Sequence, residues 1–492
     1  MPALVLVLKE NISLILKLGA GFFADAYDLF VVDIVLAIFS QLNTDDPAGL
    51  GYTTFAVSAI ASATAFGAIV GMIVFGLVGD YIGRRVAVLI TGSLVATGSI
   101  LSACCMRSEN FSLMSQLVIC RAILGFGIGG EYPLSATIAS EGVSSNIRDR
   151  IVAGVFSMQG FGMLVSSLLG YIFCVAGVSL EITWRFLLAF GCVPALVALK
   201  FRIAMHEYKP TIQEGNQSRG GSVGALSSRN VSIDNPKQDD VQEGLNTSSS
   251  ALANTTANVL ANTSSSFVAQ NGAASSTNGV VPLDPSVETK THWSVVKKYS
   301  HLLFGTMICW FLLDVTFYGT GEFKHSVSES IYGDSTVQSS TFFSLMISLM
   351  ALPGYLCTVI FIDRIGRWTL QFAGFLATAC MYALMGISVK FSAPSGVQFF
   401  IFGLCFFFTN FGPNATTFII PSEIFPSLVR ATCHGMSAAA GKSGAVLGGF
   451  GFPIANSAIG LANVMYICSS IAASGALATY VFLPKKIVQP NK

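Results

Sequence analysis

Charged side chains are scarce in this sequence. Only 11% of its 492 residues are Asp, Glu, Lys or Arg, whereas soluble domains carry about 25%. The 27 basic residues nearly balance the 26 acidic ones, so the chain lacks the basic excess of a nucleic-acid-binding protein. These shortages argue against a water-soluble protein, and we expect no nucleic-acid partner.

Paired cysteines are also lacking. The 11 cysteines include no Cys-x-x-Cys pair, and most lie inside apolar stretches, where cysteine acts as a small buried hydrophobe. We therefore predict no disulfide framework, no metal site and no cofactor. No nucleophile is accompanied by a positioned base, so we do not expect an enzyme.

Long hydrophobic runs are abundant. The chain is 52% hydrophobic with a mean hydropathy of +0.66. A bilayer core requires about 20 consecutive apolar residues per helix. About six such runs lie between residues 15 and 205, and about six between 299 and 484. We expect the first run to be a span and not a removed signal peptide, because no small-residue cleavage site follows it.

The prediction is an all-α membrane protein of twelve transmembrane helices in two six-helix halves, residues 1–205 and 299–492. Residues 206–298 are rich in Asn, Ser and Thr and predict a disordered cytoplasmic linker. By the positive-inside rule, the side that carries the basic helix boundaries is cytoplasmic and holds both termini. Those basic residues are Arg84, Arg85, Arg148, Arg150, Lys200, Arg202, Lys297, Lys298, Arg364, Arg367, Arg430, Lys485 and Lys486.

The two halves repeat each other. Asp80-Tyr-Ile-Gly-Arg84 recurs 283 positions later as Asp363-Arg-Ile-Gly-Arg367. Ser140-Glu141, with an Arg seven residues beyond the Glu, recurs 282 positions later at Ser422-Glu423. Parallel six-helix halves are typical of rocking secondary transporters with a substrate site at the midplane.

Two glycine motifs resemble nucleotide-binding loops. Gly125-Phe-Gly-Ile-Gly-Gly130 fits the dinucleotide fingerprint, and Gly441-Lys442-Ser443 resembles part of a phosphate-binding loop. Both lie inside apolar runs, so we interpret the glycines as positions of close helix packing.

Ionisable residues within spans are functional candidates, because a charge at the bilayer centre costs several kcal/mol unless it faces a cavity or a partner. They are Asp25 and Asp28 in the first span, Arg121 and Glu131 in the fourth, Asp314 in the seventh and Lys442 in the eleventh. The alternative is that some only hold helices together, for instance a pair of Arg121 with Glu131 or with an Asp.

Further polar side chains accompany these charges. Trp310, Asp314 and Tyr318 recur every four residues and share one helix stripe. The repeat relates Tyr132 to Asn414, and it places Gln159 level with Lys442. A site of neutral donors, one ammonium and one carboxyl binds an oxyanion well only when the carboxyl is protonated. Burial and a nearby anion both favour that form, so anion and proton would bind cooperatively.

Several motifs carry a family resemblance: Gly21-Phe-Phe-Ala-Asp25-Ala-Tyr-Asp28, Gly129-Gly-Glu131-Tyr132-Pro, Trp310-Phe-Leu-Leu-Asp314-Val-Thr-Phe-Tyr318, Asn410-Phe-Gly-Pro-Asn414 and Thr432-Cys-His434-Gly-Met-Ser-Ala-Ala-Ala-Gly-Lys442. In these the chain resembles the phosphate:proton symporter family of the major facilitator superfamily, which includes fungal and plant high-affinity phosphate transporters. The resemblance covers both halves and omits the linker.

The resemblance implies a phosphate site formed by Tyr132, Gln159, Trp310, Asp314, Tyr318 and Asn414, with Lys442 nearby. It also implies a proton route through Asp25, Asp28, Arg121 and Glu131, with Asp314 linking protonation to phosphate. Members of the family usually carry Asp where this chain has Glu131, so its pairing with Arg121 is expected to differ.

We therefore expect a multi-pass phosphate importer coupled to protons, with the plasma membrane favoured by the resemblance. Two alternatives stay open. One is the same fold carrying an organic solute such as a sugar or organic phosphate. The other is a phosphate receptor that signals through the linker and retains some transport.

Overall fold

The computed structural model describes residues 2–45, 48–108, 110–141, 148–203, 292–333 and 336–485. Within these ranges every regular element is an α-helix, as predicted. In chain order the helices are α1 (Pro2–Asp45), α2 (Thr54–Tyr81), α3 (Arg84–Ala103), α4 (Leu113–Glu141), α5 (Arg148–Val175), α6 (Leu180–Phe190), α7 (Cys192–Ile203), α9 (His292–Lys298), α10 (Ser300–Gly321), α11 (Lys324–Tyr332), α12 (Val337–Ile365), α13 (Arg367–Lys390), α14 (Ser395–Asn410), α15 (Pro413–Ile424), α16 (Arg430–Ile459) and α17 (Leu461–Phe482).

Ten helical stretches of the described chain are long and apolar enough to cross a membrane. α6 and α7 together make one of these stretches, and α14 and α15 make another. Two further long helices, α1 and α16, pack in the same bundle against α5 and α10 respectively. With them the described residues supply the twelve spans that the sequence predicts.

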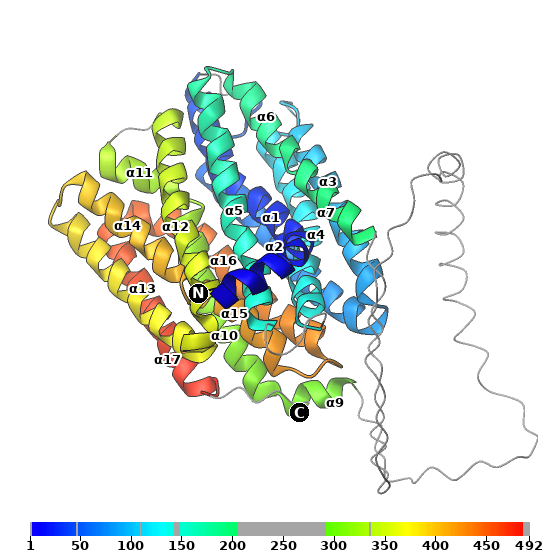
Figure 1. Ribbon diagram of the computed structural model, residues 1–492. Helices are drawn as coiled ribbons and strands as arrows, with labels where there is room; N and C mark the ends of the chain where they lie inside the picture. The colour runs from blue at the N-terminus through cyan, green and yellow to red at the C-terminus, as the bar shows by residue number, and fades with distance from the viewer. Residues whose placement is uncertain are drawn as a thin grey trace, which may run out of the picture. The chain divides into compact units, whose positions relative to one another are not determined.

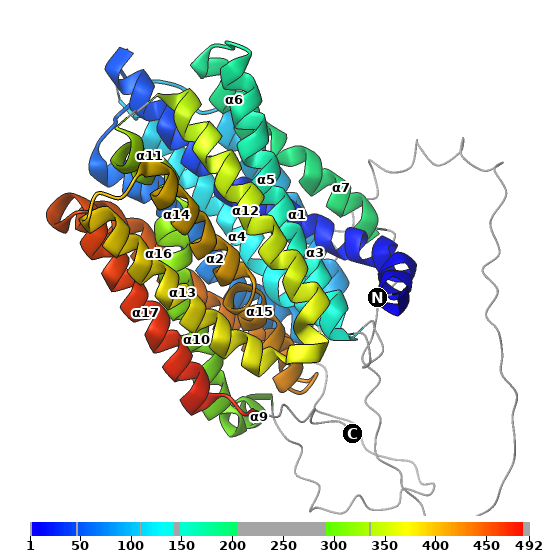
Figure 2. The same ribbon diagram turned by 60° about the vertical axis from the view of Figure 1, so that its left-hand side comes forward.

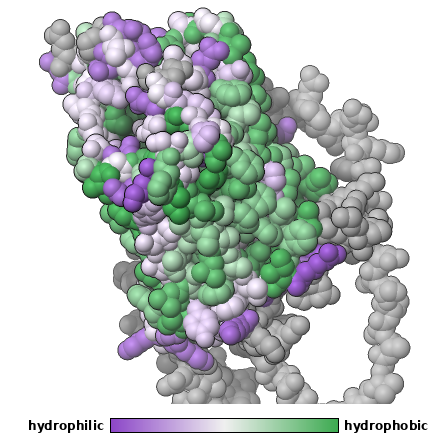
Figure 3. All heavy atoms as spheres, turned by 90° about the vertical axis from the view of Figure 1, so that its left-hand side faces the viewer, coloured by the Kyte–Doolittle hydropathy of each residue, from purple (hydrophilic) through white to green (hydrophobic). Residues whose placement is uncertain are grey.

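The surface of the bundle is that of a membrane protein. Figure 3 shows a broad hydrophobic belt between two hydrophilic ends. Large apolar side chains point outward on many helices, among them Ile73, Phe304, Leu376 and Leu477. Because lipid tails solvate such side chains as well as a protein core does, the exposure is stable only in a bilayer. The protein is a multi-pass membrane protein.

The two halves meet through corresponding helices. α2 of the first half packs along α16 of the second, and α5 packs along α12. Figure 2 shows α5 and α12 side by side down the length of the bundle. In Figure 1, α9 lies at the lower end of the bundle and α11 at the upper end, and these are called the α9 end and the α11 end below.

The glycine motif of the fourth span is a packing surface, as the sequence indicates. Its residues lie inside α4, with no strand before them in the described chain. A Cβ on Gly125 would lie 2.8 Å from the backbone carbonyl carbon of Thr64 on α2, and one on Gly127 would lie 2.9 Å from Val95 N on α3. Glycine is therefore required for α4 to approach both neighbours.

The tenth span is broken where a site residue is needed. Gly412 separates α14 from α15 with φ of +154°, a conformation that other residues rarely adopt, and Pro413 starts α15. Asn414 consequently lies in the first turn of α15, inside the bundle. Discontinuous helices of this kind commonly form substrate sites in transporters.

The predicted linker, residues 206–298, lies outside the described residues except for its last seven. These form α9, and its Val296 packs against Phe425 and Val429. The prediction of disorder is wrong for these seven residues, because valines on one face of the segment have an apolar surface to cover. For the rest of the linker it stays a prediction.

Candidate functional site

A buried ion pair lies at the centre of the bundle. Lys442 on α16 donates from Nζ to Asp314 Oδ2 on α10 at 3.2 Å, and both residues are 1% exposed. The ammonium also lies 3.8 Å from the ring centroid of Tyr318 and 5.2 Å from that of Tyr132. The ammonium thus pairs with one carboxylate and lies against two phenol rings, with no water-exposed face.

Aromatic side chains from both halves enclose this pair. Tyr132 of α4 lies 6.3 Å from Trp310 of α10, measured between ring centroids, and Phe418 of α15 lies 6.3 Å from each of them. Phe22 of α1 packs edge-on to Tyr132 at 5.1 Å. These rings keep the pair dry, which strengthens every electrostatic interaction inside.

Amide groups form a second part of the centre. Asn414 donates from Nδ2 to Tyr355 Oη at 2.9 Å and to Asn410 Oδ1 at 2.7 Å. Gln159 on α5 is buried, and its Oε1 has no hydrogen-bond partner in the described chain. Asn410 Nδ2 is also without one. Buried amide atoms without partners are rare, because each costs about 1–3 kcal/mol.

Glu131 has a different partner from the one expected. Both oxygens of its carboxylate accept from the guanidinium of Arg202 on α7, at 2.5 Å for Arg202 Nη1, and Oε1 also accepts from Thr91 at 2.9 Å. Of the two partners that the sequence left open for Arg121, Glu131 is not the one it meets. Arg121 and Glu131 lie ten residues apart on α4, about 15 Å along the helix, so their side chains cannot meet.

Gly21 of α1 makes room for this pair. A Cβ at that position would lie 2.6 Å from Glu131 Oε2 and would overlap Arg202. Arg202, which the sequence suggested as a cytoplasmic boundary charge, is instead 4% exposed. Sequence reasoning missed its role because it also fits the basic boundary pattern.

Arg121 pairs with the first span, as the structural alternative anticipated. Its Nη1 lies 3.8 Å from Asp28 Oδ1, and its Nη2 donates to the backbone carbonyl of Asp28. Ser99 donates to Asp28 Oδ2 at 3.0 Å. Asp25, one turn earlier on α1, is buried without an ion pair or side-chain hydrogen bond among the described residues, and its Oδ2 has no partner.

Asp25 connects the two clusters. The charged groups close enough to act on its carboxyl include Glu131 and Arg202 of one pair and Lys442 of the other. The structure therefore brings the predicted phosphate residues and the predicted proton residues into one continuous buried polar region. This region spans α1, α4, α7, α10 and α16.

A third cluster, which sequence reasoning missed, lies at the α11 end. Lys324 Nζ is 3.7 Å from Asp33 Oδ2, which also accepts from Ser344 Oγ at 2.7 Å. Glu322, directly after α10, is buried nearby. Asp33 lies within the first apolar run, so the rule that ionisable residues in spans are functional would have found it. Glu322 and Lys324 lie just past a span and carry no such signal.

The halves are tied together at both ends. At the α9 end, Asp80 accepts from the backbone N–H of Thr432 at 2.8 Å, and Arg150 pairs with Asp363 while Arg367 pairs with Asp149. At the α11 end, Asp33 of α1 binds α11 and α12. The polar region between them is enclosed on both sides, so this is a closed conformation.

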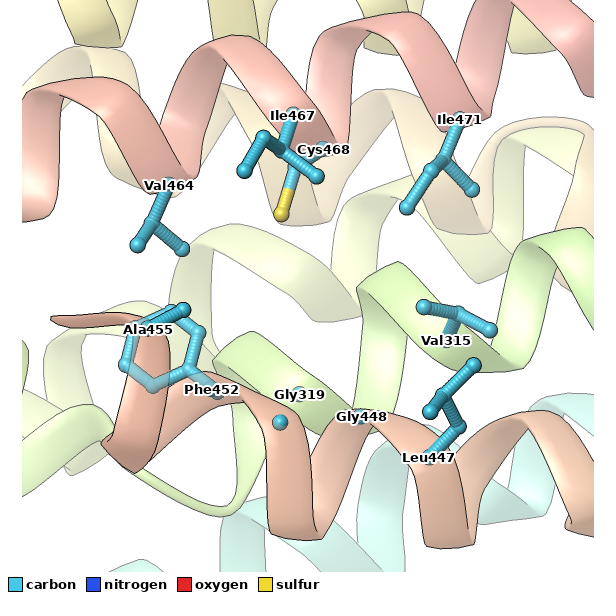
Figure 4. A pocket seen from close by; sticks show the side chains of 11 residues that line it. Val315, Gly319, Leu447, Gly448, Phe452, Ala455, Val464, Ile467, Cys468 and Ile471 are labelled. Carbon is cyan, nitrogen blue, oxygen red and sulfur yellow. The ribbon is translucent and has the colours of Figure 1, made fainter. Parts of the chain in front are cut away.

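An apolar pocket of about 230 Å³ lies apart from the polar region. In Figure 4, Val464, Ile467 and Ile471 of α17 face Val315 of α10 and Leu447 of α16. These residues offer no donor or charge, so the pocket does not suit an anion. α10 and α16 thus present small and apolar residues to α17 and their ionisable residues to the interior.

Comparisons with known proteins agree with this architecture. The family model described as the Major Facilitator Superfamily matches residues 18–449. The solved structure of the proton:xylose symporter XylE with a bound bromo-deoxyglucose superimposes with a TM-score of 0.69 over 96% of this chain and 97% of that one, at 17% identity. A partially occluded inward-open form of XylE from E. coli gives 0.66 over 96% and 99%, also at 17% identity. Twelve spans in two related halves around a buried polar centre thus place the chain in the major facilitator superfamily of membrane transporters.

Curated relatives define the family more closely. The chain is 30% identical to the "Probable inorganic phosphate transporter 1-12" of Oryza sativa subsp. japonica and 32% identical to the "Probable inorganic phosphate transporter 1-6" of Arabidopsis thaliana, in each case over 96% of this chain and 90% of the relative. It is 31% identical to the "Low affinity inorganic phosphate transporter 4" of Medicago truncatula over 90% and 83%. The chain belongs to the inorganic phosphate transporter family of that superfamily.

Proposed function

We propose that the protein is a proton-coupled importer of inorganic phosphate that works by alternating access. The observation that carries the proposal is the dry ion pair of Lys442 with Asp314, enclosed by polar and aromatic side chains from both halves. The names of the curated relatives support the same substrate. The proposal places the protein in the plasma membrane, which the family resemblance favours. It also places the α9 end in the cytoplasm, because basic residues concentrate at that end.

The phosphate site would consist of one cation and several neutral groups. Its members are Tyr132, Gln159, Trp310, Asp314, Tyr318, Asn414 and Lys442, all buried. The phenol O–H groups and the indole and amide N–H groups would donate to phosphate oxygens, and the free Oε1 of Gln159 would accept from a phosphate hydroxyl. A site that both donates and accepts favours a protonated oxyanion such as phosphate over one that only accepts.

Asp314 would couple the proton to the anion. In the closed structure its carboxylate forms an ion pair with the ammonium of Lys442, which is then not available to phosphate. A proton on Asp314 frees that ammonium for phosphate and removes the repulsion between two anions. Proton and phosphate then raise each other's affinity, which is the thermodynamic requirement for symport.

The first-half cluster would provide the proton route. Asp25 and Asp28 lie three residues apart on α1, and Asp25 is close enough to feel both the pair of Glu131 with Arg202 and the ammonium of Lys442. Arg121 would hold Asp28 in place through its side chain and its backbone carbonyl. Protons and phosphate would bind from outside, the halves would rock, and loss of the proton to the cytoplasm would leave Asp314 charged and release phosphate.

Asp314→Asn tests the coupling. The amide mimics the protonated carboxyl, so phosphate binding by the purified variant should be retained while proton-driven accumulation in proteoliposomes is lost. Ser443→Ala is the matched control, because Ser443 is adjacent to Lys442, but among the described residues its hydroxyl donates only to the backbone carbonyl of Ala439. Full accumulation by Asp314→Asn would exclude Asp314 as the coupling group.

A competition series tests the substrate. Unlabelled phosphate and arsenate should displace radiolabelled phosphate, whereas glycerol phosphate and glucose should not, because aromatic side chains leave the centre little space. If glucose or glycerol phosphate displaced the radiolabelled phosphate at similar concentrations, the substrate would be an organic solute and not inorganic phosphate.

A further inference from the structure

The buried carboxyls of the bundle outnumber the buried cations. Leaving aside the network at the α9 end, six carboxyl side chains and four cations are buried among the described residues. Four carboxyls take one cation each: Asp28 with Arg121, Asp33 with Lys324, Glu131 with Arg202, and Asp314 with Lys442. Asp25 and Glu322 remain without an ion pair in the described chain, and Asp25 Oδ2 and Glu322 Oε2 have no hydrogen-bond partner.

Glu322 lies at the junction of the two halves. The charged groups close enough to act on it come from four helices: Lys442 on α16, Asp33 on α1, Lys324 on α11 and Arg121 on α4. Gly449 on α16 lies beside both Glu322 and Ser62 of α2, since a Cβ at this glycine would be 3.4 Å from Glu322 Oε2 and 2.6 Å from Ser62 Oγ. The Ser62 hydroxyl is also buried and has no hydrogen-bond partner among the described residues. Each of the three cations is already held by another carboxylate.

This arrangement repeats that of the centre. Asp314 and Glu322 lie eight residues apart, about 12 Å along α10, and Asp25 and Asp33 lie eight apart on α1. Lys442 is paired with Asp314 and lies close enough to act on both Asp25 and Glu322. Lys324, nearer the α11 end, is paired with Asp33 and also acts on Glu322. Near the centre Asp314 is therefore paired and Asp25 is not, and nearer the α11 end Asp33 is paired and Glu322 is not.

An unpaired ionised carboxyl in a dry interior costs several kcal/mol, whereas its neutral acid costs far less. We infer that Glu322 is a proton-binding site of the transport cycle, which holds a proton in the closed state and exchanges it with outside water when the halves separate at the α11 end. Because α1, α2 and α4 move as part of one half and α10, α11 and α16 as part of the other, rocking changes the surroundings of Glu322. The inference rests on the proposed proton-coupled transport.

The ratio of protons to phosphate tests the assignment. Glu322→Gln preserves shape and removes the titrating group, so proteoliposomes with this variant should carry one proton fewer per phosphate than the wild type. The matched control is Glu329→Gln on the exposed face of α11, which should leave the ratio unchanged. An unchanged ratio in Glu322→Gln, with coupled uptake in the wild type, overturns the inference and leaves the proposed function standing. Uncoupled uptake in the wild type instead contradicts the proposed function itself.

A second measurement does not depend on transport. The infrared spectrum of the purified wild type should contain the carbonyl absorption of a protonated carboxyl that Glu322→Gln lacks and Glu329→Gln retains. The Gln variant should also melt within about 2 °C of the wild type, because it resembles the neutral acid. Identical carboxyl absorption in the wild type and Glu322→Gln, or a large loss of stability in that variant, would show an ionised Glu322 and contradict the inference.

Discussion

α1 and α10 are the first membrane spans of the two halves, and they differ in which of their buried acids is ion-paired. Asp25 and Asp33 on α1 lie eight residues apart, as do Asp314 on α10 and Glu322 directly after it, and all four are buried. α1 also carries a third buried acid, Asp28, which is paired with Arg121. On α10 the central carboxyl, Asp314, is paired, whereas on α1 the central one, Asp25, is not. At the α11 end the order is reversed, with Asp33 paired and Glu322 free.

We infer from this difference that paired and unpaired carboxyls start the transport cycle in different protonation states. A paired carboxyl is ionised in the closed state and holds its lysine in place, and Asp314 would take up its proton only as it releases Lys442. An unpaired one is stable in the dry interior only with a proton, so it is suited to carry one.

The two acids of α1, one paired and one unpaired, should differ most in what their replacement costs in stability. Asp33→Asn leaves Lys324 buried without its carboxylate and should lower the free energy of unfolding by about 3–5 kcal/mol. By the reasoning applied to Glu322, we expect Asp25 to be neutral in the closed state, so Asp25→Asn should change the free energy of unfolding by less than about 1 kcal/mol. Thermal unfolding of both purified variants in one detergent checks the comparison. Equal losses would show that Asp25 is ionised in the closed state.

The two lysines provide the next comparison. Lys442→Met removes the cation proposed to bind phosphate and should weaken equilibrium phosphate binding about 10- to 100-fold, since a hydrogen bond to a charged group contributes about 1.5–3 kcal/mol. Lys324→Met should change phosphate affinity much less, because Lys324 lies at the α11 end with Asp33. A larger loss of phosphate affinity in Lys324→Met than in Lys442→Met would show that phosphate binds near Lys324 at the α11 end and not at the centre.

A smaller effect is expected at Glu131. Glu131→Asp restores the acid that is usual in the family but shortens the side chain by one methylene. With the backbone of α4 held against α2 and α3, the Asp would lose at least one of its contacts with Arg202 or Thr91, at about 1–2 kcal/mol of stability. Calorimetric unfolding of the variant measures this loss. An unchanged or raised melting temperature would mean that Arg202 follows the shorter carboxylate.

The smallest effect concerns the linker. Deleting residues 210–290 removes no residue of the buried polar region, so phosphate uptake at equal amounts of protein in the membrane should be unchanged. Wild-type proteoliposomes prepared in parallel provide the reference. Loss of uptake despite correct folding would favour the receptor function over a simple carrier.

Much of this arrangement is visible in the sequence, for definite reasons. Hydrophobic runs of bilayer length predict the twelve spans, and the repeat of the Asp80 and Asp363 motifs predicts the two halves. The stripe of Trp310, Asp314 and Tyr318 lies in the centre because side chains four residues apart share a helix face. Spacing on a single helix is therefore a dependable guide.

The pairings between helices are not visible in the sequence. Arg202 fits the pattern of a cytoplasmic boundary charge, and only the packing of α7 against α1 and α3 brings it to Glu131. In the sequence, Tyr355 is a single phenol within an apolar run and gives no functional signal. Only the helix break at Gly412 brings Asn414 into hydrogen-bonding distance of it. Glu322 and Lys324 fall just beyond a span, and their burial depends on the fold of α11. Which cation meets which carboxylate is a property of tertiary structure.

The central claim is that phosphate and protons move together through the buried polar region. The most direct measurement is uptake of radiolabelled phosphate by proteoliposomes of the purified protein, with and without an inward proton gradient. We expect phosphate to accumulate above its outside concentration when the gradient is present, and this accumulation to collapse when a protonophore is added. Absence of uptake under both conditions by folded protein would contradict the central claim.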